Sequence, residues 1–494
     1  MKIWRWFVTK SLNKVVLISE NGDEMNQKKL TKLGFIYVYF IIGLIMVINY
    51  PKSSDVILNQ NYIVNTLAYF FMTGLFLIIF FKNRLDIFDP IFLFSIIYIT
   101  MFSIVPNYDI AIGEILWFGV YLFEYGIRGT SFATLGYLVF CFTYTVHINR
   151  KPKKKIIFIE RTEIYNKSLI AFLSLTLWII CLILSVVYLV LSGGMNLAYI
   201  FTLGVAGSVS PSILTPIGVI SLFSYSLIPL SLVYNKYGKS KIVKIFLFVV
   251  TLLIQMIRGF RFIAIILILA YGVFYYLSVG RRPSGKSILS ILIILAFLTG
   301  IMGFYRGDVR AGNEIDWDTF STEDVNESII GNFRIYKTYY GIIKAVPNLT
   351  SYTYGEQMFV YTLVLFIPRA IWPEKPSPPG TQAIELGISD YALKAGQAYP
   401  FIGEYYKEFG LLGILFFMGI FGYFMRYIKT KYLYNKSDPF GLMVYSILLP
   451  TTFQIMIRGY TPSNFYLVIF LVLPVLIIKY CSRSRLLKLV KEEK

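Results

Sequence analysis

Apolar runs close to 20 residues long recur along the whole chain, and they constrain its fold more than any other feature. A helical run of this length spans the hydrocarbon core of a bilayer. The chain has 494 residues, of which 56% are hydrophobic and only 15% charged, and its mean hydropathy is +0.65. In a soluble protein about a quarter of the residues are charged. The sequence therefore predicts an all-α polytopic membrane protein.

We place about twelve membrane-spanning helices in the sequence. The predicted spans are residues 33–49, 62–81, 87–105, 128–146, 169–192, 212–233, 245–257, 263–279, 288–305, 411–428, 440–457 and 465–480. They make residues 1–494 a single transmembrane domain with one large connection, residues 306–410. Within this connection, residues 357–371 are apolar but too few to span. We expect them to form an interfacial or re-entrant helix.

Basic residues concentrate in every second connection between the predicted spans. Examples are NRKPKKK at 149–155, GRRPSGK at 280–286 and the tail that begins at Cys481. Because Lys and Arg accumulate on the cytoplasmic side, we expect these connections and both termini in the cytoplasm, and residues 306–410 on the external face. The net charge of +20 then reflects topology. Nucleic-acid binding is not expected, because the basic stretches are scattered between spans.

Arginine is frequent among the cations that are predicted to lie outside. These arginines are Arg128, Arg258, Arg261, Arg306, Arg310, Arg334, Arg369 and Arg458. A guanidinium grips phosphate oxygens through two parallel hydrogen bonds, so we expect an anionic ligand on the external face. The alternative is that these side chains contact lipid headgroups or pair with acids of the large connection.

The short predicted span at residues 245–257 places two of these arginines below the membrane surface. As a helix it is about 20 Å long, which is less than the roughly 30 Å apolar thickness of a bilayer. A charge at such a depth costs roughly 3 kcal/mol and indicates a functional site. We therefore expect Arg258 and Arg261 to bind substrate in a cavity. Arginines from other external helix ends and from the large connection would join them there: Arg306, Arg310, Arg369 and Arg458.

Two motifs carry a resemblance to a known family. The first, FIPRAIWPEKPSPPG at 366–380, contains a Pro-Arg pair and a Trp-Pro-x-Lys-Pro corner, and the second is FIGEYYKEFGLLG at 401–413. Together with the predicted spans and the late external connection, they resemble the Wzy-type oligosaccharide repeat-unit polymerases of bacteria, which make O-antigen and capsular polysaccharide. Because prolines restrict the backbone, we expect the corner to fix the direction from which Arg369 enters the cavity.

The resemblance implies a glycosyltransferase of the bacterial cytoplasmic (inner) membrane. Such polymerases transfer a glycan from undecaprenyl diphosphate onto the non-reducing end of a new lipid-linked repeat unit, on the external face. Donor and acceptor are then both undecaprenyl-diphosphate-linked oligosaccharides within the membrane lipids. A flippase and a chain-length regulator of the same pathway are expected partners. No cofactor is implied, and the sequence lacks the His, Cys and Asp spacing typical of a metal site.

The reaction needs a base for the acceptor hydroxyl. The related O-antigen ligases use an external histidine, whereas the only histidine of this chain, His147, lies at the cytoplasmic end of a predicted span. A carboxylate is therefore favoured. We expect Glu404 in GEYYKEFG to be the base, with Asp308 and Glu408 as alternatives. Glu404 could instead only pair with an arginine.

Aromatic residues are abundant around both motifs. Because aromatic faces pack against the C–H groups of sugars, we expect Trp372 and Tyr405 to contact the glycan. The alternative is that these aromatic residues only lie at the membrane interface, where Tyr and Trp collect whatever the function of the protein.

Two other functions remain open from the sequence. One is an O-antigen ligase or another polyprenyl-dependent glycosyltransferase. The other is a transporter or flippase of lipid-linked oligosaccharides, which would need charged or polar residues deep in several spans. Nearly all charges lie instead at the ends of the predicted spans.

Overall fold

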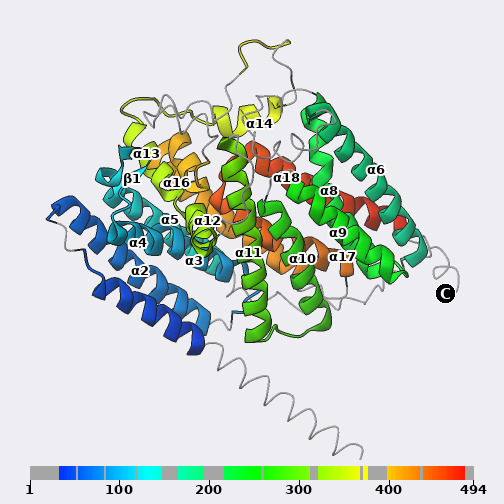
Figure 1. Ribbon diagram of the computed structural model, residues 1–494, viewed down its shortest axis with the longest axis horizontal. Coiled ribbons are helices and arrows are strands. Elements are labelled where there is room, and N and C mark those ends of the chain that lie inside the picture. The colour runs from blue at the N-terminus through cyan, green and yellow to red at the C-terminus, as the bar shows by residue number, and fades with distance from the viewer. Residues whose placement is uncertain are drawn as a thin grey trace, which may run out of the picture.

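The structure is a computed structural model, and it describes residues 33–51, 54–82, 85–117, 119–146, 165–193, 216–257, 261–311, 321–365, 367, 371–375, 398–433 and 438–483. Within these ranges the chain is almost entirely helical (Figure 1). Its one small sheet there pairs strand β1 (Leu116–Trp117) with strand β2 (Val120–Tyr121) in antiparallel fashion. The all-α fold predicted from the sequence is confirmed.

Helices overlap every predicted span. They are Leu33–Ile48, α2 (Val56–Lys82), α3 (Pro90–Ile99) continued by η1 (Thr100–Ile104) and α4 (Val105–Ile112), η2 (Phe123–Tyr125) leading into α5 (Gly126–Val146), α6 (Lys167–Gly193), α8 (Pro216–Tyr237), α9 (Lys241–Ile257), α10 (Arg261–Val279), α11 (Gly285–Ala311), α16 (Phe401–Ile428) continued by η8 (Lys429–Leu433), α17 (Pro439–Ile457) and α18 (Thr461–Ser482). Eight helices of the described residues are long and apolar enough to cross a membrane. A multi-pass membrane protein is confirmed, and the number of twelve spans stays a prediction.

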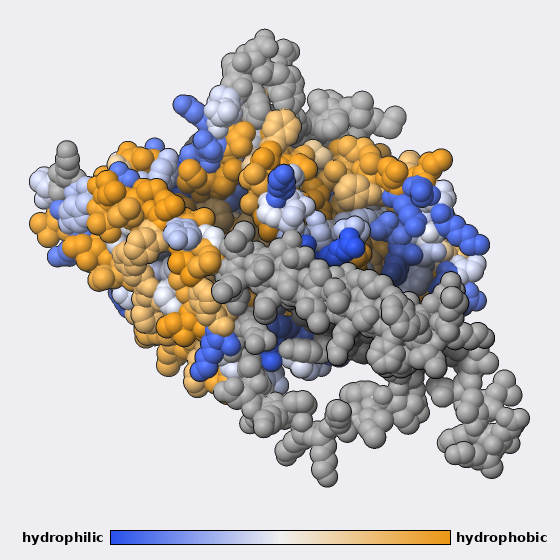
Figure 2. Space-filling model, turned by 90° about the horizontal axis from the view of Figure 1, so that it is seen from below, coloured by the Kyte–Doolittle hydropathy of each residue, from blue (hydrophilic) through white to orange (hydrophobic). Residues whose placement is uncertain are grey.

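The surface is apolar over large areas, as contact with lipid requires. Large side chains such as Ile78 (65%), Phe142 (67%) and Phe172 (65%) are exposed on α2, α5 and α6. Figure 2 shows apolar side chains gathered over the left part of the molecule, where the N-terminal helices lie in Figure 1. Exposed apolar area on this scale marks an interaction surface, here one that lipid would cover.

Ion pairs join the connections that are predicted to be cytoplasmic, at one end of the bundle. The pairs are Arg282–Asp86, Lys429–Asp89 and Lys479–Asp438. Connections predicted to be external meet at the other end, at which α14 lies in Figure 1; we call this the α14 end. Which end faces the cytoplasm stays a prediction.

The large connection at residues 306–410 consists mainly of short helices wherever the structure describes it. These are α12 (Thr322–Phe333), α13 (Tyr336–Ala345), η6 (Glu356–Val360) and α14 (Tyr361–Val364). The helix expected at residues 357–371 ends at Val364, earlier than predicted. The cause is Pro368, which disfavours helical conformation at Ile367.

Helix α13 is buried on all sides, although its sequence YKTYYGIIKA is mostly polar and aromatic. Tyr336, Tyr339 and Tyr340 each expose 0% of their surface. Glycine in α5 makes room for them, since a Cβ at Gly129 would lie 2.6 Å from the Tyr340 ring. These tyrosines therefore belong to the core, and they are not available as sugar-binding aromatics.

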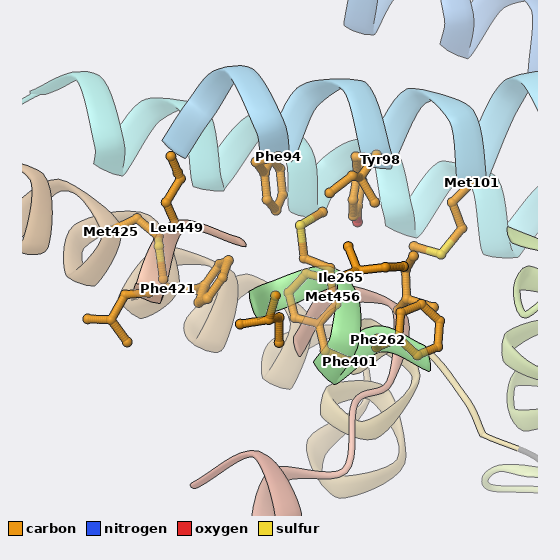
Figure 3. Close-up of a cluster of buried hydrophobic side chains, with 14 of the residues drawn as sticks. Phe94, Tyr98, Met101, Phe262, Ile265, Phe401, Phe421, Met425, Leu449 and Met456 are labelled. Carbon is orange, nitrogen blue, oxygen red and sulfur yellow. The ribbon is translucent and has the colours of Figure 1, made fainter. Parts of the chain in front are cut away.

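Helix α16 is kinked at its second motif glycine. Gly410 has φ +64° and ψ −148°, a conformation that is essentially restricted to glycine. The kink separates the first two turns, which carry GEYYKEFG, from the longer apolar part. Phe401 at the helix start lies near Phe94 and Tyr98 of α3 and near Met456 of α17 (Figure 3). The start of α16 is thus packed against α3 and the end of α17.

Candidate active site

The motif GEYYKEFG brings three charged side chains into the protein interior. Glu404 and Lys407 each expose 2% of their surface, and Glu408 exposes 1%. A buried charge is destabilising unless it is hydrogen-bonded or paired. Each of these side chains must therefore have protein or substrate partners.

The Glu404 carboxylate caps the N-terminus of α18. Its Oε1 accepts a hydrogen bond from the backbone N–H of Thr461 at 2.9 Å, and its Oε2 accepts one from the Thr461 hydroxyl at 2.7 Å. Both donors are neutral, and none of the ion pairs between described residues includes Glu404. The positive end of the α18 dipole favours the anion at this place. Glu404 is thus held in one orientation by neutral groups.

The other two charged residues of the motif tie α16 to η6. Glu408 accepts hydrogen bonds from the backbone N–H groups of Gly355 at 2.6 Å and Met358 at 2.9 Å. The Lys407 ammonium donates to Gln357 Oε1 at 2.8 Å. Glu408, the alternative base, is therefore occupied by the backbone donors that begin η6.

Arg458 ends α17 and lies against the start of α10. Its guanidinium carbon is 4.9 Å from the ring centroid of Phe262, the residue that follows Arg261. The next residue, Gly459, touches the backbone at the start of α16, because a Cβ there would lie 2.1 Å from Phe401 Cα. The end of α17 therefore contacts the N-terminal ends of both α10 and α16.

Three helix N-termini converge at this place. Helix α10 starts at Arg261, α16 at Phe401 and α18 at Thr461, and the contacts of Phe262, Gly459 and Glu404 join them. Each N-terminus carries partial positive charge and backbone N–H groups without helical partners. Together with the Arg458 guanidinium, they suit an anionic ligand.

The other arginines that were predicted to line the cavity, and Asp308, are placed only by their backbone or lie outside the described residues. Arg261 is the first residue of α10, and Arg306, Asp308 and Arg310 lie in the last two turns of α11. Arg258 and Arg369 lie outside the described residues. Their roles stay predictions.

The two predicted sugar-binding aromatics differ in their surroundings. Trp372 exposes 36% of its surface and is open to a ligand. Tyr405 exposes 7%, and its ring packs 5.1 Å from Phe417 and 5.4 Å from Phe401. This position suits core packing better than contact with a sugar.

The corner WPEKP contains a functional candidate that the sequence analysis missed. The Lys375 side chain is buried at 2% exposure, and its ammonium donates to Leu365 O at 2.7 Å and to Ile367 O at 3.0 Å. It also lies 5.2 Å from the ring centroid of Tyr361. A lysine between two prolines was the available signal. The shape of the corner therefore depends on a buried ammonium as well as on prolines.

A second buried cluster of charges surrounds Asp109 in α4. Asp109 pairs with Arg334 at 2.9 Å and with Lys337 at 3.2 Å, and the Tyr336 hydroxyl donates to it at 2.8 Å. Burial lowers the pKa of Lys337, although Asp109 opposes this shift. Arg334 also pairs with Glu327 of the large connection. Arg334 therefore pairs with acids of the protein, which was the alternative to binding an anionic ligand.

No group of three or more His, Cys, Asp or Glu side chains that could hold a metal ion occurs within the described ranges.

The fold and the site together define a class: a helical multi-pass membrane protein with buried carboxylates and an arginine where several helices meet at one end. The chain belongs to the Wzy family, since the family model described as O-antigen polysaccharide polymerase Wzy matches residues 32–485. No curated protein and no solved structure matches the chain. The resemblance carried by the two motifs is confirmed, and the protein is a glycosyl-transferring polymerase of polysaccharide biosynthesis.

Proposed function

We propose that the chain polymerises undecaprenyl-diphosphate-linked oligosaccharide repeat units on the outer face of the bacterial cytoplasmic membrane, without a metal ion or cofactor. A hydroxyl at the non-reducing end of a new unit attacks C1 of the growing glycan. The bond from C1 to the diphosphate oxygen breaks, undecaprenyl diphosphate leaves with the bonding electrons, and the hydroxyl proton passes to a base. A flippase that delivers the units and a chain-length regulator are the proposed partners.

The surroundings of Glu404 are the observation that supports this proposal most. A general base needs a fixed position and a carboxylate that is not already bound to a cation. Thr461 fixes the position through two neutral donors at 2.9 and 2.7 Å. Glu404 is therefore our first candidate for accepting the proton, and Asp308 is the alternative that the structure leaves open.

The leaving diphosphate requires positive charge where the bond breaks. Arg458 and the N-termini of α10 and α16, which meet the end of α17, supply such charge. We propose that other predicted arginines extend this site along the diphosphate: Arg258, Arg261, Arg306, Arg310 and Arg369. The exposed Trp372 is the proposed contact for the glycan.

The arginine site can be tested with purified protein in liposomes that contain lipid-linked repeat units. A charge-assisted contact is worth roughly 1.5–3 kcal/mol, so Arg458→Ala should lower the rate about tenfold to a hundredfold. Lysine at this position should restore only part of the rate, because the guanidinium fork is lost. Normal rates and chain lengths in Arg458→Ala and Arg261→Ala would reduce both residues to lipid-headgroup contacts.

The proposed orientation has its own test. A reporter fused after Ser284 should be cytoplasmic, and a reporter fused after Ser321 should be external, because the two positions lie on either side of α11. Reporters that both indicate the same side would contradict the external location of the site.

A further inference from the structure

The hydroxyl of Tyr399 is buried close enough to Glu404 to interact with its charge, and it has no hydrogen-bond partner among the described residues. Tyr399 exposes 8% of its surface, and its hydroxyl oxygen has no partner among the described residues. A buried tyrosine hydroxyl usually finds a partner, and an orphaned one requires an explanation such as an absent ligand.

The backbone of Tyr399 is fixed by the elements that form the site. Its carbonyl accepts a hydrogen bond from Gly459 N at 2.9 Å, directly after Arg458. Tyr399 immediately precedes Pro400, the N-cap of α16, and Glu404 is in the first turn of that helix. Tyr399 is therefore held between the end of α17 and the base candidate.

The electrostatic surroundings keep the Tyr399 hydroxyl protonated. Burial raises its pKa well above the usual value, and the Glu404 charge raises it further. The neighbouring Tyr460 differs, because its hydroxyl is hydrogen-bonded to Tyr361. Of these two tyrosines, Tyr399 is thus the one whose hydroxyl hydrogen has no acceptor among the described residues.

A protonated phenol and a carboxylate that lie side by side offer one hydrogen-bond donor and one acceptor, which together match the hydroxyl group of an alcohol. One alcohol group can donate its hydrogen to a carboxylate while its oxygen accepts from a phenol. A phosphate oxygen suits this place poorly, since it would face the Glu404 anion and has no hydrogen to donate. Diphosphate is therefore expected on the Arg458 side of the site.

We propose that Tyr399 binds the acceptor sugar by donating its hydroxyl hydrogen to the oxygen that attacks, while that oxygen's own hydrogen is bonded to Glu404. The inference rests on the proposed function and deepens it. During transfer the acceptor oxygen forms its new bond to C1, its proton moves to Glu404, and the leaving diphosphate takes the electrons of the broken bond. The Tyr399 proton stays on Tyr399.

The test separates acceptor from donor with two analogues of the lipid-linked unit. One has its acceptor hydroxyl methylated and serves only as donor. The other carries a non-cleavable C-phosphonate in place of the anomeric oxygen and serves only as acceptor. Single transfers by the reconstituted full-length protein then give separate kcat and KM values for each substrate.

Tyr399→Phe should lower kcat/KM for the acceptor about tenfold, the effect of one buried hydrogen bond, and leave the KM for the donor unchanged. The matched control is Tyr339→Phe, which removes another fully buried hydroxyl without a partner among the described residues, on α13. It should leave both substrates unaffected.

Wild-type acceptor kinetics in Tyr399→Phe, or an equal loss for donor and acceptor, would overturn the role of Tyr399. Loss of acceptor kinetics in both tyrosine variants would overturn it too, because the effect would then come from packing. Failure of the wild-type protein to join the two analogues would contradict the proposed function itself.

Discussion

Asp109 and Glu404 are both buried carboxylates near the α14 end of the bundle, but they are stabilised in opposite ways. Asp109 faces two cations, Arg334 and Lys337. Glu404 accepts from the backbone N–H and the hydroxyl of Thr461, which carry no net charge. The first arrangement engages the carboxylate in ion pairs, whereas the second holds a carboxylate in a fixed place by neutral donors.

The comparison teaches that burial and charge alone do not identify a site. The Asp109 cluster joins α4 to α13 and balances its own charges, so it accounts for the burial of a polar helix. The Glu404 cluster joins helix ends and includes the Tyr399 hydroxyl, which has no partner in the described chain. The charges of the Asp109 cluster are paired within the protein, whereas the Tyr399 hydroxyl beside Glu404 is the group that we propose a ligand completes.

Replacing Glu404 should have the largest effect on catalysis. General base catalysis contributes about 10²–10⁴-fold to a rate, so Glu404→Gln should lower kcat by that factor. The amide oxygen can still accept from Thr461, and the amount of folded protein should change little. Single-turnover transfer in liposomes is the measurement. A rate close to wild type would show that Glu404 is not the base and would make Asp308 the next candidate.

Replacing Asp109 should instead affect folding. Asp109→Asn removes the buried counter-charge that Arg334 and Lys337 share, and breaking a buried pair costs about 3–5 kcal/mol. We expect a lower midpoint of thermal unfolding in detergent and less protein in membranes. The control is Glu327→Gln, because Glu327 pairs with the same Arg334 from a side chain that is 63% exposed. That change should cost at most about 1 kcal/mol. Equal stability of both variants would remove the contrast between the two clusters.

Lys375 extends the comparison to a buried cation. Like Glu404, it is held by neutral groups, because its ammonium donates to two backbone carbonyls. Lys375→Met keeps the apolar stem and removes the donors, and it should cost about 1–3 kcal/mol within the corner. We expect severalfold slower polymerisation with nearly unchanged global unfolding, together with faster protease cleavage between residues 365 and 375. Lys375→Arg should lie between Met and wild type. A large loss of global stability would show that the corner supports the whole fold.

The positions of the long helices could be predicted because lipid imposes a simple length and composition rule. Helix α13 was not predicted by this rule. Its sequence is polar, and it is buried only because Asp109 compensates Lys337 and because Gly129 makes room for Tyr340. Neither partner lies nearby in the sequence.

The candidate site was predictable in part. The motif GEYYKEFG singled out Glu404, and the arginine pattern singled out Arg458, which does lie where helix ends meet. Thr461, Tyr399 and Lys375 were missed, since their roles depend on contacts with distant or folded-back segments. Tyr405 was chosen by its residue type, and its ring packs near Phe401 and Phe417, so its contact with a sugar stays a prediction.

The cap that Thr461 places on Glu404 has a consequence for biosynthesis. The two residues are 57 positions apart, so the ribosome releases Glu404 well before its donors exist. Until the hairpin of α17 and α18 has entered the membrane, the start of α16 carries a carboxylate that cannot be buried without a large penalty. Insertion of the last hairpin therefore completes the site, and a nascent or truncated chain that lacks it would present an exposed, charged helix end to the quality-control proteases of the membrane.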